Sequence, residues 1–316
     1  MVYRRLKYII RIGISCLFVG YLAFKVDWAP VLSALGHIDL LLYFVSALLA
    51  LPSSLLLAFR YYLLIRDTSI SRPLVSLIKI NFILRFYSLL LPSSVGTEAI
   101  RWYKVTRNQS GRLLFMASTI FERLVFIFVL LIFGFFPLLY YSSYPEITIL
   151  RDRLLPPIIL VMCLSIAAMA YFFSPVIRYP INDALNLIVP SRWRRQNITS
   201  ILNNFSLSNP TFSLFALILG LSLAGHIFFL CRLFTLVKSA DLPLSLLDVS
   251  WMGSLVLLLQ LLPISFAGIG IREGGYAYLF TVFELPPEKG VLIGILLFSQ
   301  MLIFAIIGGI FDLLEK

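Results

Sequence analysis

Charged residues are scarce in this sequence. Asp, Glu, Lys and Arg make up 13% of its 316 residues, whereas a soluble domain averages about 25%. Hydrophobic residues make up 60%, and the mean hydropathy is +0.96. No polar stretch is long enough to fold as a separate soluble domain, while apolar runs of membrane-spanning length, about 20 residues, recur throughout. The composition therefore predicts an all-α, polytopic integral membrane protein with about six to eight transmembrane helices.

Residues that catalysis and metal binding commonly use are also rare. There are two histidines, His37 and His226, and three cysteines, Cys16, Cys163 and Cys231. Each cysteine lies in an apolar run, where a thiol behaves as a small hydrophobe, so we expect neither disulfides nor a metal cluster. The Gly-x-x-x-x-Gly-Lys-Ser/Thr, His-Glu-x-x-His and Gly-x-Ser-x-Gly motifs are all absent. We therefore expect no catalytic residue, no metal and no cofactor.

The net charge of +11 has the sign that nucleic acid attracts, but no module of basic and aromatic residues accompanies it. Basic residues that flank transmembrane helices set the orientation of those helices and contact anionic lipids. We therefore expect membrane lipids as partners, and no nucleic acid.

Apolar segments of spanning length divide the chain, and no domain boundary separates them, so we interpret residues 1–316 as a single transmembrane domain. The first segment follows basic residues but lacks a small-x-small cleavage site, which indicates an uncleaved helix. Two further apolar stretches, 74–91 and 247–263, end in clusters of Pro, Ser and Gly. The expected spans are 8–26, 40–59, 113–139, 155–174, 211–237 and 290–313.

The charges between the spans indicate how 74–91 and 247–263 lie. If both stretches enter and leave on the same side, basic residues concentrate on one side, as they do on the cytoplasmic side of membrane proteins. We therefore predict two re-entrant segments, both chain ends in the cytoplasm, and a location in the cytoplasmic (inner) membrane. The predicted cytoplasmic bases are Arg4, Arg5, Lys7, Arg60, Arg66, Arg72, Lys79, Arg101, Lys104, Arg107, Arg112, Arg178, Arg192, Arg194 and Arg195.

The longest polar insertion covers about residues 175–210 and contains Trp193 among arginines. Two interpretations remain open: a helix that lies at the level of the lipid headgroups, or a simple cytoplasmic loop.

Two interrupted stretches share one pattern. Residues 91–101 read Leu-Pro-Ser-Ser-Val-Gly-Thr-Glu-Ala-Ile-Arg, and residues 262–273 read Leu-Pro-Ile-Ser-Phe-Ala-Gly-Ile-Gly-Ile-Arg-Glu. Three predicted spans separate them, and an odd number of crossings places the two breaks on opposite sides of the membrane. This spacing predicts an inverted repeat, with half-repeats of roughly 1–150 and 175–316, whose broken helices meet near the bilayer midplane.

Proline and glycine explain why the helices break there. Proline removes a backbone donor, and glycine supplies the conformations that a turn requires. Backbone groups freed in this way must be buried in protein or face water, and Ser93, Ser94, Thr97 and Ser265 can pair with them. The helix that starts after each turn points its amides at the cavity, which suits an anionic group. An ordinary interfacial turn is the alternative.

Ionisable residues at membrane depth need partners, because a charge at the bilayer centre costs at least about 2.5–3.5 kcal/mol. Adjacent helical residues point about 100° apart, so we expect Glu122 and Arg123 to have different partners. The expected partners of Glu122 are Arg85, Arg101 or Arg272, and those of Arg123 are Glu98 or Glu273. We expect His226 to be a hydrogen-bonded packing residue and Arg60 to extend toward the membrane surface.

The first break, Pro92-Ser93-Ser94-Val95-Gly96-Thr97-Glu98-x-x-Arg101, resembles a signature of the lysylphosphatidylglycerol synthase transmembrane, or flippase-like, family. Phe121-Glu122-Arg123 and Gly268-Ile269-Gly270-Ile271-Arg272-Glu273 resemble the other signatures of that family in the same order. Thr97 departs from the pattern, because the family often has a second glycine there. The resemblance implies a membrane domain that moves polar-headed lipids between leaflets.

Some members of the family carry a soluble aminoacyltransferase domain that charges phosphatidylglycerol with lysine. The last predicted span ends close to Lys316, so we expect that domain, and the phosphatidylglycerol lysyltransferase activity, to be missing.

Three functions remain open at this point. The first is a flippase or transporter for an anionic or aminoacylated lipid. The second is an intramembrane lipid-modifying enzyme that uses Glu122 or Glu98 as a base. The third is a non-catalytic partner of a lipid-modifying enzyme or a glycosyltransferase. The predicted substrate-binding residues are Arg85, Pro92, Ser93, Gly96, Glu98, Arg101, Glu122, Arg123, Gln260, Pro263, Ser265, Gly268, Gly270, Arg272 and Glu273.

Overall fold

The computed structural model describes residues 28–70, 72–91, 94–109, 111–140, 145–188, 211–262, 265 and 267–314. Regular structure in these ranges is helical throughout and contains no strand, as predicted. The predicted span 8–26, Trp193 with its arginines, and three predicted site residues, Pro92, Ser93 and Pro263, lie outside the described residues.

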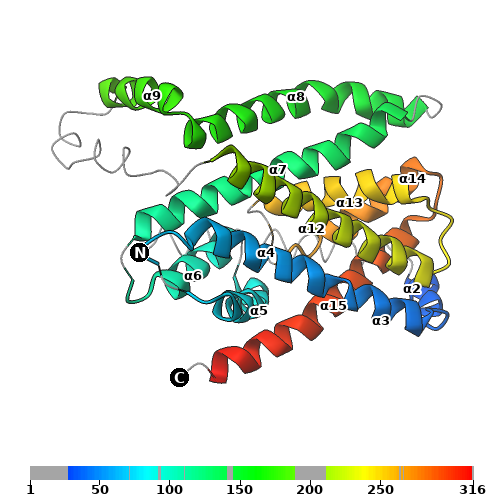
Figure 1. Ribbon diagram of the computed structural model, residues 1–316. Coiled ribbons are helices and arrows are strands. Elements are labelled where there is room, and N and C mark those ends of the chain that lie inside the picture. Colours follow the sequence, from blue (N-terminus) through cyan, green and yellow to red (C-terminus); the bar gives the residue numbers. More distant parts are fainter. Residues whose placement is uncertain are drawn as a thin grey trace, which may run out of the picture.

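Five helical stretches in the described part of the chain are long and apolar enough to cross a membrane, which makes the chain a multi-pass membrane protein. The helices, drawn in Figure 1, are α2 (Trp28–Leu35), α3 (Leu40–Leu48), α4 (Ala50–Ile65), α5 (Leu74–Leu90), α6 (Ser94–Thr106), α7 (Arg112–Tyr140), α8 (Pro145–Phe173), α9 (Pro175–Ile188), α12 (Phe212–Ser239), α13 (Leu246–Leu261), α14 (Ile271–Val282) and α15 (Pro287–Leu314).

Two helix boundaries differ from the expected ones. The predicted span 40–59 is divided at Leu49 into α3 and α4, because Pro52 cannot donate a hydrogen bond to the carbonyl of Leu48. Helix α8 begins ten residues before the predicted 155, because its first turns carry charged residues, including Arg151 and Asp152, that an apolar pattern leaves out. The polar insertion of about residues 175–210 begins with a helix, α9.

Helices α5 and α6 form a first hairpin whose two outer ends meet. Arg72, just before α5, donates from Nε to the carbonyl of Val105 at 3.0 Å and from Nη2 to the carbonyls of Lys104 and Arg107 at 3.2 and 2.9 Å. A guanidinium at a helix C-terminus satisfies carbonyls that have no partner within the helix. The start of α5 is thereby fixed beside the end of α6.

Helices α13 and α14 form a second hairpin of the same kind. Helix α13 begins with a capping box, in which Asp248 accepts from the Ser245 amide at 2.6 Å and Ser245 accepts from the Asp248 amide at 3.2 Å. Trp251 near the start of α13 packs on Phe283 after the end of α14, with the ring centroids 5.7 Å apart. The two outer ends of this hairpin therefore also lie together.

The two hairpins lie at opposite ends of the helix bundle. Helices α7 and α12 run along the bundle between them, α8 lies on its outer side against α7, and Figure 1 shows α6 and α14 near opposite ends. Each hairpin also belongs to a different hydrophobic core. Leu77, Val105 and Phe115 belong to the core beside the first hairpin, whereas Val249 and Phe280 belong to the core beside the second.

Helix α15 packs closely against both hairpins through glycines. A Cβ at position 308 would overlap the carbonyl of Phe82 in α5, and one at position 290 would lie 2.6 Å from the backbone of Tyr276 in α14. One turn after Gly290, a Cβ at Gly294 would lie 2.9 Å from Cα of Glu273. Small residues at such spacing allow backbones to approach closely within a membrane. Helix α15 therefore contacts the backbone of both hairpins.

Candidate functional site

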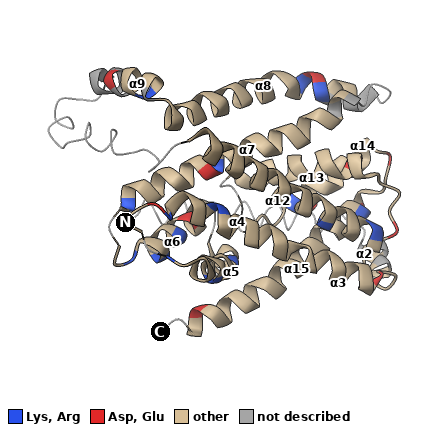
Figure 2. Ribbon diagram, viewed as in Figure 1, with Lys and Arg blue, Asp and Glu red and all other residues tan. Residues whose placement is uncertain are grey.

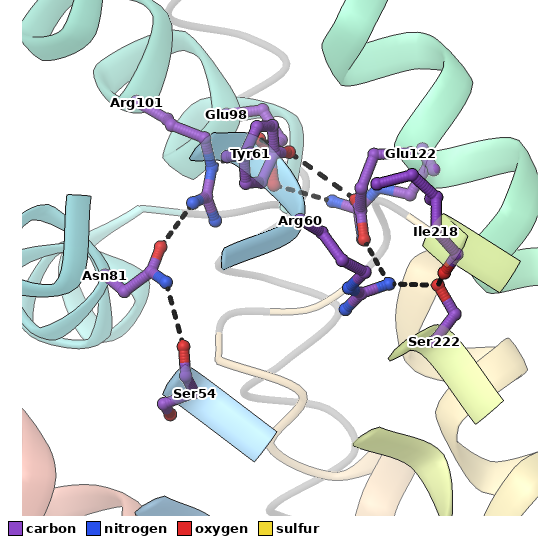
Figure 3. A network of polar contacts seen from close by, with 10 residues as sticks. Ser54, Arg60, Tyr61, Asn81, Glu98, Arg101, Glu122, Ile218 and Ser222 are labelled. Carbon is purple, nitrogen blue, oxygen red and sulfur yellow. Dashed lines mark hydrogen bonds and ion pairs between the residues drawn. The ribbon is translucent and has the colours of Figure 1, made fainter. Parts of the chain in front are cut away.

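Glu98 on the first hairpin makes two ion pairs, one within α6 and one from α6 to α7. Its Oε2 accepts from Nε of Arg101, one turn later on α6, at 2.9 Å, and its Oε1 accepts from Nη2 of Arg123 on α7 at 3.1 Å. Arg101 also donates from Nη1 to Oδ1 of Asn81 on α5 and stacks over the Tyr61 ring of α4, 4.5 Å from its centroid (Figure 3). The predicted pairing of Arg123 with Glu98 is therefore confirmed.

A second ion pair joins α4 to α7. Arg60 Nη1 lies 2.8 Å from Glu122 Oε1 and donates to Ser222 Oγ of α12 at 2.6 Å, as Figure 3 shows. Both charged side chains are 6% exposed. The three expected partners of Glu122 were wrong, as was the expected extension of Arg60 to the surface, because the interhelical packing directs Arg60 inward. Figure 2 shows that charged residues are few among the described helices.

The second hairpin satisfies its charges within a single turn. Gly270 has φ +84°, a conformation that favours glycine, and its amide donates to Glu273 Oε2 at 2.7 Å. Glu273 Oε1 accepts from Nε of the adjacent Arg272 at 3.0 Å, and the Arg272 guanidinium lies 5.2 Å from the Phe298 ring centroid on α15. Both charged residues are buried.

The inner ends of the two hairpins line a common cavity of about 160 Å³. Ser88 and Thr97 line it from the first hairpin, and Gln260, Ser265 and Gly268 line it from the second. Gly268 has φ +73°, and a Cβ there would lie 2.7 Å from Oε1 of Gln260. The polar turn residues from both halves of the chain are therefore in one place.

A larger cavity, of about 270 Å³, lies between α4, α5, α7, α12 and α13. Arg60, Arg85, Arg232 and His226 contribute its ionisable lining, together with the hydroxyl groups of Ser53 and Ser222. His226 Nε2 lies 3.0 Å from Ser254 Oγ, which confirms the expected hydrogen-bonded packing residue.

The predicted site residues are distributed over several clusters. Of the predicted arginines, only Arg85 lines the larger cavity, whereas Arg101, Arg123 and Arg272 are held by glutamates. Gly96 lies beside Leu91, to which an added Cβ would come within 3.2 Å. Sequence reasoning missed Arg232. The signal was available, because an arginine within an apolar run indicates a candidate functional site.

The fold and these buried charges define a polytopic helical membrane protein with ionisable groups inside the bundle. The chain belongs to the family described as the lysylphosphatidylglycerol synthase TM region, whose model matches residues 8–309. No curated protein and no solved structure matches the chain significantly.

Proposed function

We propose that this protein moves a polar-headed lipid between the leaflets of the cytoplasmic membrane. The observation that carries the proposal is the arrangement of the two hairpins, which enter the bundle from opposite ends and line one polar cavity with their inner ends. In transporters built as inverted repeats, interrupted helices from the two halves meet around the substrate in this way. The family of the chain supports a membrane role of this kind.

In an alternating-access mechanism, the cavity between the hairpins would be the point at which the route for the headgroup is closed. Its lining is formed by Ser88 and Thr97 on one side and by Gln260 and Ser265 on the other, so the two hairpins close the route from the two ends of the bundle. A headgroup that crosses the bilayer needs such hydrogen-bonding groups, because unpaired polar groups are costly in hydrocarbon. Separation of one hairpin at a time would admit the headgroup from one leaflet and release it to the other.

An intramembrane enzyme is less well supported. A carboxylate that acts as a general base must accept a proton from the substrate. Glu98 is held by two arginines and Glu122 by one, at 2.8–3.1 Å, so both carboxylates already accept hydrogen bonds from guanidinium groups. The two carboxylates therefore serve better as structural acceptors.

A cross-link between the hairpins tests the proposal. In a variant without the native cysteines, Thr97→Cys and Gln260→Cys would be joined by a short bis-maleimide after reconstitution into liposomes. The movement of a fluorescent phospholipid between leaflets would be followed by dithionite quenching of the outer leaflet. We expect the cross-linked protein to stop lipid movement, and each single-cysteine variant treated with the same reagent to retain it.

The same preparation separates the alternatives. Mass spectrometry of the liposome lipids would reveal a new lipid species if the protein were an enzyme. Wild-type protein that leaves both the leaflet distribution and the lipid composition unchanged would contradict transport and point to a partner role, which deletion of the associated lipid-modifying enzyme or glycosyltransferase would test.

A further inference from the structure

The larger cavity carries an excess of positive charge. Arg60, Arg85 and Arg232 line it, and no Asp or Glu does so in the part of the chain that the structure describes. Arg60 is neutralised by Glu122 from outside the lining. Arg85 and Arg232 have only neutral acceptors among the described residues: Arg85 Nη2 donates to Ser54 Oγ at 3.1 Å, and Arg232 Nε donates to Gln300 Oε1 at 2.9 Å.

Two buried groups on the same lining lack hydrogen-bond partners. Arg60 Nε and His226 Nδ1 contact no acceptor or donor among the described residues, although both side chains are almost fully buried. Native structures rarely leave buried polar atoms unpaired, and those that remain call for an explanation such as a bound water or ion. The two unpaired atoms are a second observation, separate from the excess of positive charge, and they belong to residues that line the same cavity.

Two arginines without counter-charges inside a membrane protein are unfavourable unless something neutralises them. Arg85 and Arg232 are partly exposed in the structure, and both line the cavity. A guanidinium presents a planar set of donors that matches the oxygens of a phosphate, and the hydroxyl of Ser53 is also on the lining. The cavity therefore has the charge, the donors and the room for a phosphate-bearing group.

We infer that this cavity is an anion-binding site, in which Arg85 and Arg232 hold the phosphodiester of an anionic lipid headgroup. The absence of a carboxylate from the described lining disfavours a headgroup with a cationic extension, so the site selects an anionic lipid over an aminoacylated or zwitterionic one. The inference deepens the proposed function by naming the lipid class, and it rests on that function only for the movement of the bound lipid. Free phosphate shares the same chemistry and is the other source to test.

Binding by the purified full chain in a nonionic detergent, measured by calorimetric titration, tests the site. The probes are short-chain phosphatidylglycerol, short-chain phosphatidylcholine, short-chain diacylglycerol and inorganic phosphate. We expect phosphatidylglycerol to bind at least about tenfold more tightly than phosphatidylcholine, and diacylglycerol not to bind. Tight binding of inorganic phosphate with no preference for phosphatidylglycerol would instead identify a free-phosphate site and overturn the lipid assignment.

Charge-neutral variants show whether the two arginines make the site. We expect Arg85→Gln and Arg232→Gln each to weaken phosphatidylglycerol binding by about tenfold or more. The matched control is Arg66→Gln, because Arg66 is exposed and paired with Asp67 outside the cavity. Phosphatidylglycerol binding that is unchanged in both cavity variants would overturn the inference.

Thermal unfolding without lipid separates binding from folding. Since neither arginine has a carboxylate partner, we expect both cavity variants to unfold at the same temperature as the wild type or a higher one, and to lose the increase that phosphatidylglycerol produces. A lower unfolding temperature without lipid would make these arginines structural and overturn the inference. Binding without leaflet movement would contradict the proposed function alone, and leaflet movement without selective binding would contradict this site alone.

Discussion

The two hairpins solve the problem of buried charge in different ways. Glu98 in the first hairpin pairs with Arg101 on the same helix and with Arg123 on α7, so the hairpin is tied to its neighbours by charge. Glu273 in the second hairpin bonds the amide of Gly270 and the side chain of Arg272, so its charges are satisfied within one turn. Both hairpins also contact α15 through glycines, the second at Gly290 and Gly294 and the first at Gly308.

Two similar sequence patterns can therefore produce hairpins that differ in how firmly ion pairs hold them to the neighbouring helices. A hairpin whose ion pairs reach neighbouring helices moves only if those pairs break or if the neighbours move with it. A hairpin with self-contained charges can move as a rigid unit, because no ion pair changes partner. The first hairpin is therefore expected to be the more strongly tethered of the two.

We expect the largest loss of stability when the buried ion pair between Arg60 on α4 and Glu122 on α7 is broken. We expect Glu122→Leu to destabilise the protein by about 3–5 kcal/mol, because Arg60 would remain buried without its counter-charge. The double variant Arg60→Met with Glu122→Leu should recover most of that loss. Chemical unfolding in mixed micelles would measure both. A double variant as unstable as the single one would show that the pair itself does not set the stability.

Glycine substitutions along α15 compare the contacts of the two hairpins directly. We expect Gly308→Ala to cost about 3 kcal/mol and Gly290→Ala about 2 kcal/mol, because each Cβ would collide with a backbone of the facing hairpin. Gly274→Ala in α14 is the control, since a Cβ there meets nothing within 4 Å, and it should be neutral or slightly stabilising. The same unfolding assay would rank them. Equal costs for all three would contradict the close packing of α15.

Paired glutamine substitutions isolate the difference in charge arrangement. Glu98→Gln should cost about 2 kcal/mol, less than a fully buried pair because the glutamate side chain is 20% exposed, and should loosen α6 from α7. Glu273→Gln should also cost about 2 kcal/mol, because Arg272 would stay buried without its counter-charge although the amide oxygen can still accept from Gly270. Hydrogen exchange would locate the loosened segments. Loosening of α7 by the Glu273 variant would refute the self-contained turn.

Thiol labelling should show that the outer ends of the two hairpins face opposite sides of the membrane, and we expect the labelled variants to be as stable as the wild type. In a variant without the native cysteines, Arg107→Cys and Lys289→Cys place exposed thiols beside the outer ends of the first and second hairpins. We expect a membrane-impermeant maleimide added to intact cells to label position 289 and not position 107. Labelling of both positions from the same side would contradict the opposed hairpins.

The helices were predictable from the sequence, because membrane spans depend on local composition. The second hairpin's turn was also indicated locally, by Gly268 and Gly270, which both adopt positive φ angles. The partner of Glu122 was not predictable. Arg60 lies 62 positions away, and only the packing of α4 on α7 decides that it points inward rather than toward the surface. Arg232 was not predicted for a different reason, since one arginine in an otherwise apolar run does not interrupt the hydropathy pattern of a span.

Helix α15 is long enough to contact both hairpins, one near each of its ends. Its 28 residues extend about 42 Å, which exceeds a hydrocarbon core of about 30 Å, so the helix reaches both membrane surfaces. Gly290 contacts the second hairpin near one end and Gly308 the first near the other. Between them stands Gln300, fully buried, which accepts from Arg232 at 2.9 Å and donates to the carbonyl of Tyr43 at 3.1 Å.

A rigid helix that is held near its midpoint can pivot about that point. If α15 rotates about Gln300, its two ends swing in opposite directions, and each end carries a different hairpin. Widening of the bundle at one membrane surface would then be accompanied by narrowing at the other, without any signal passing through the cavity between them.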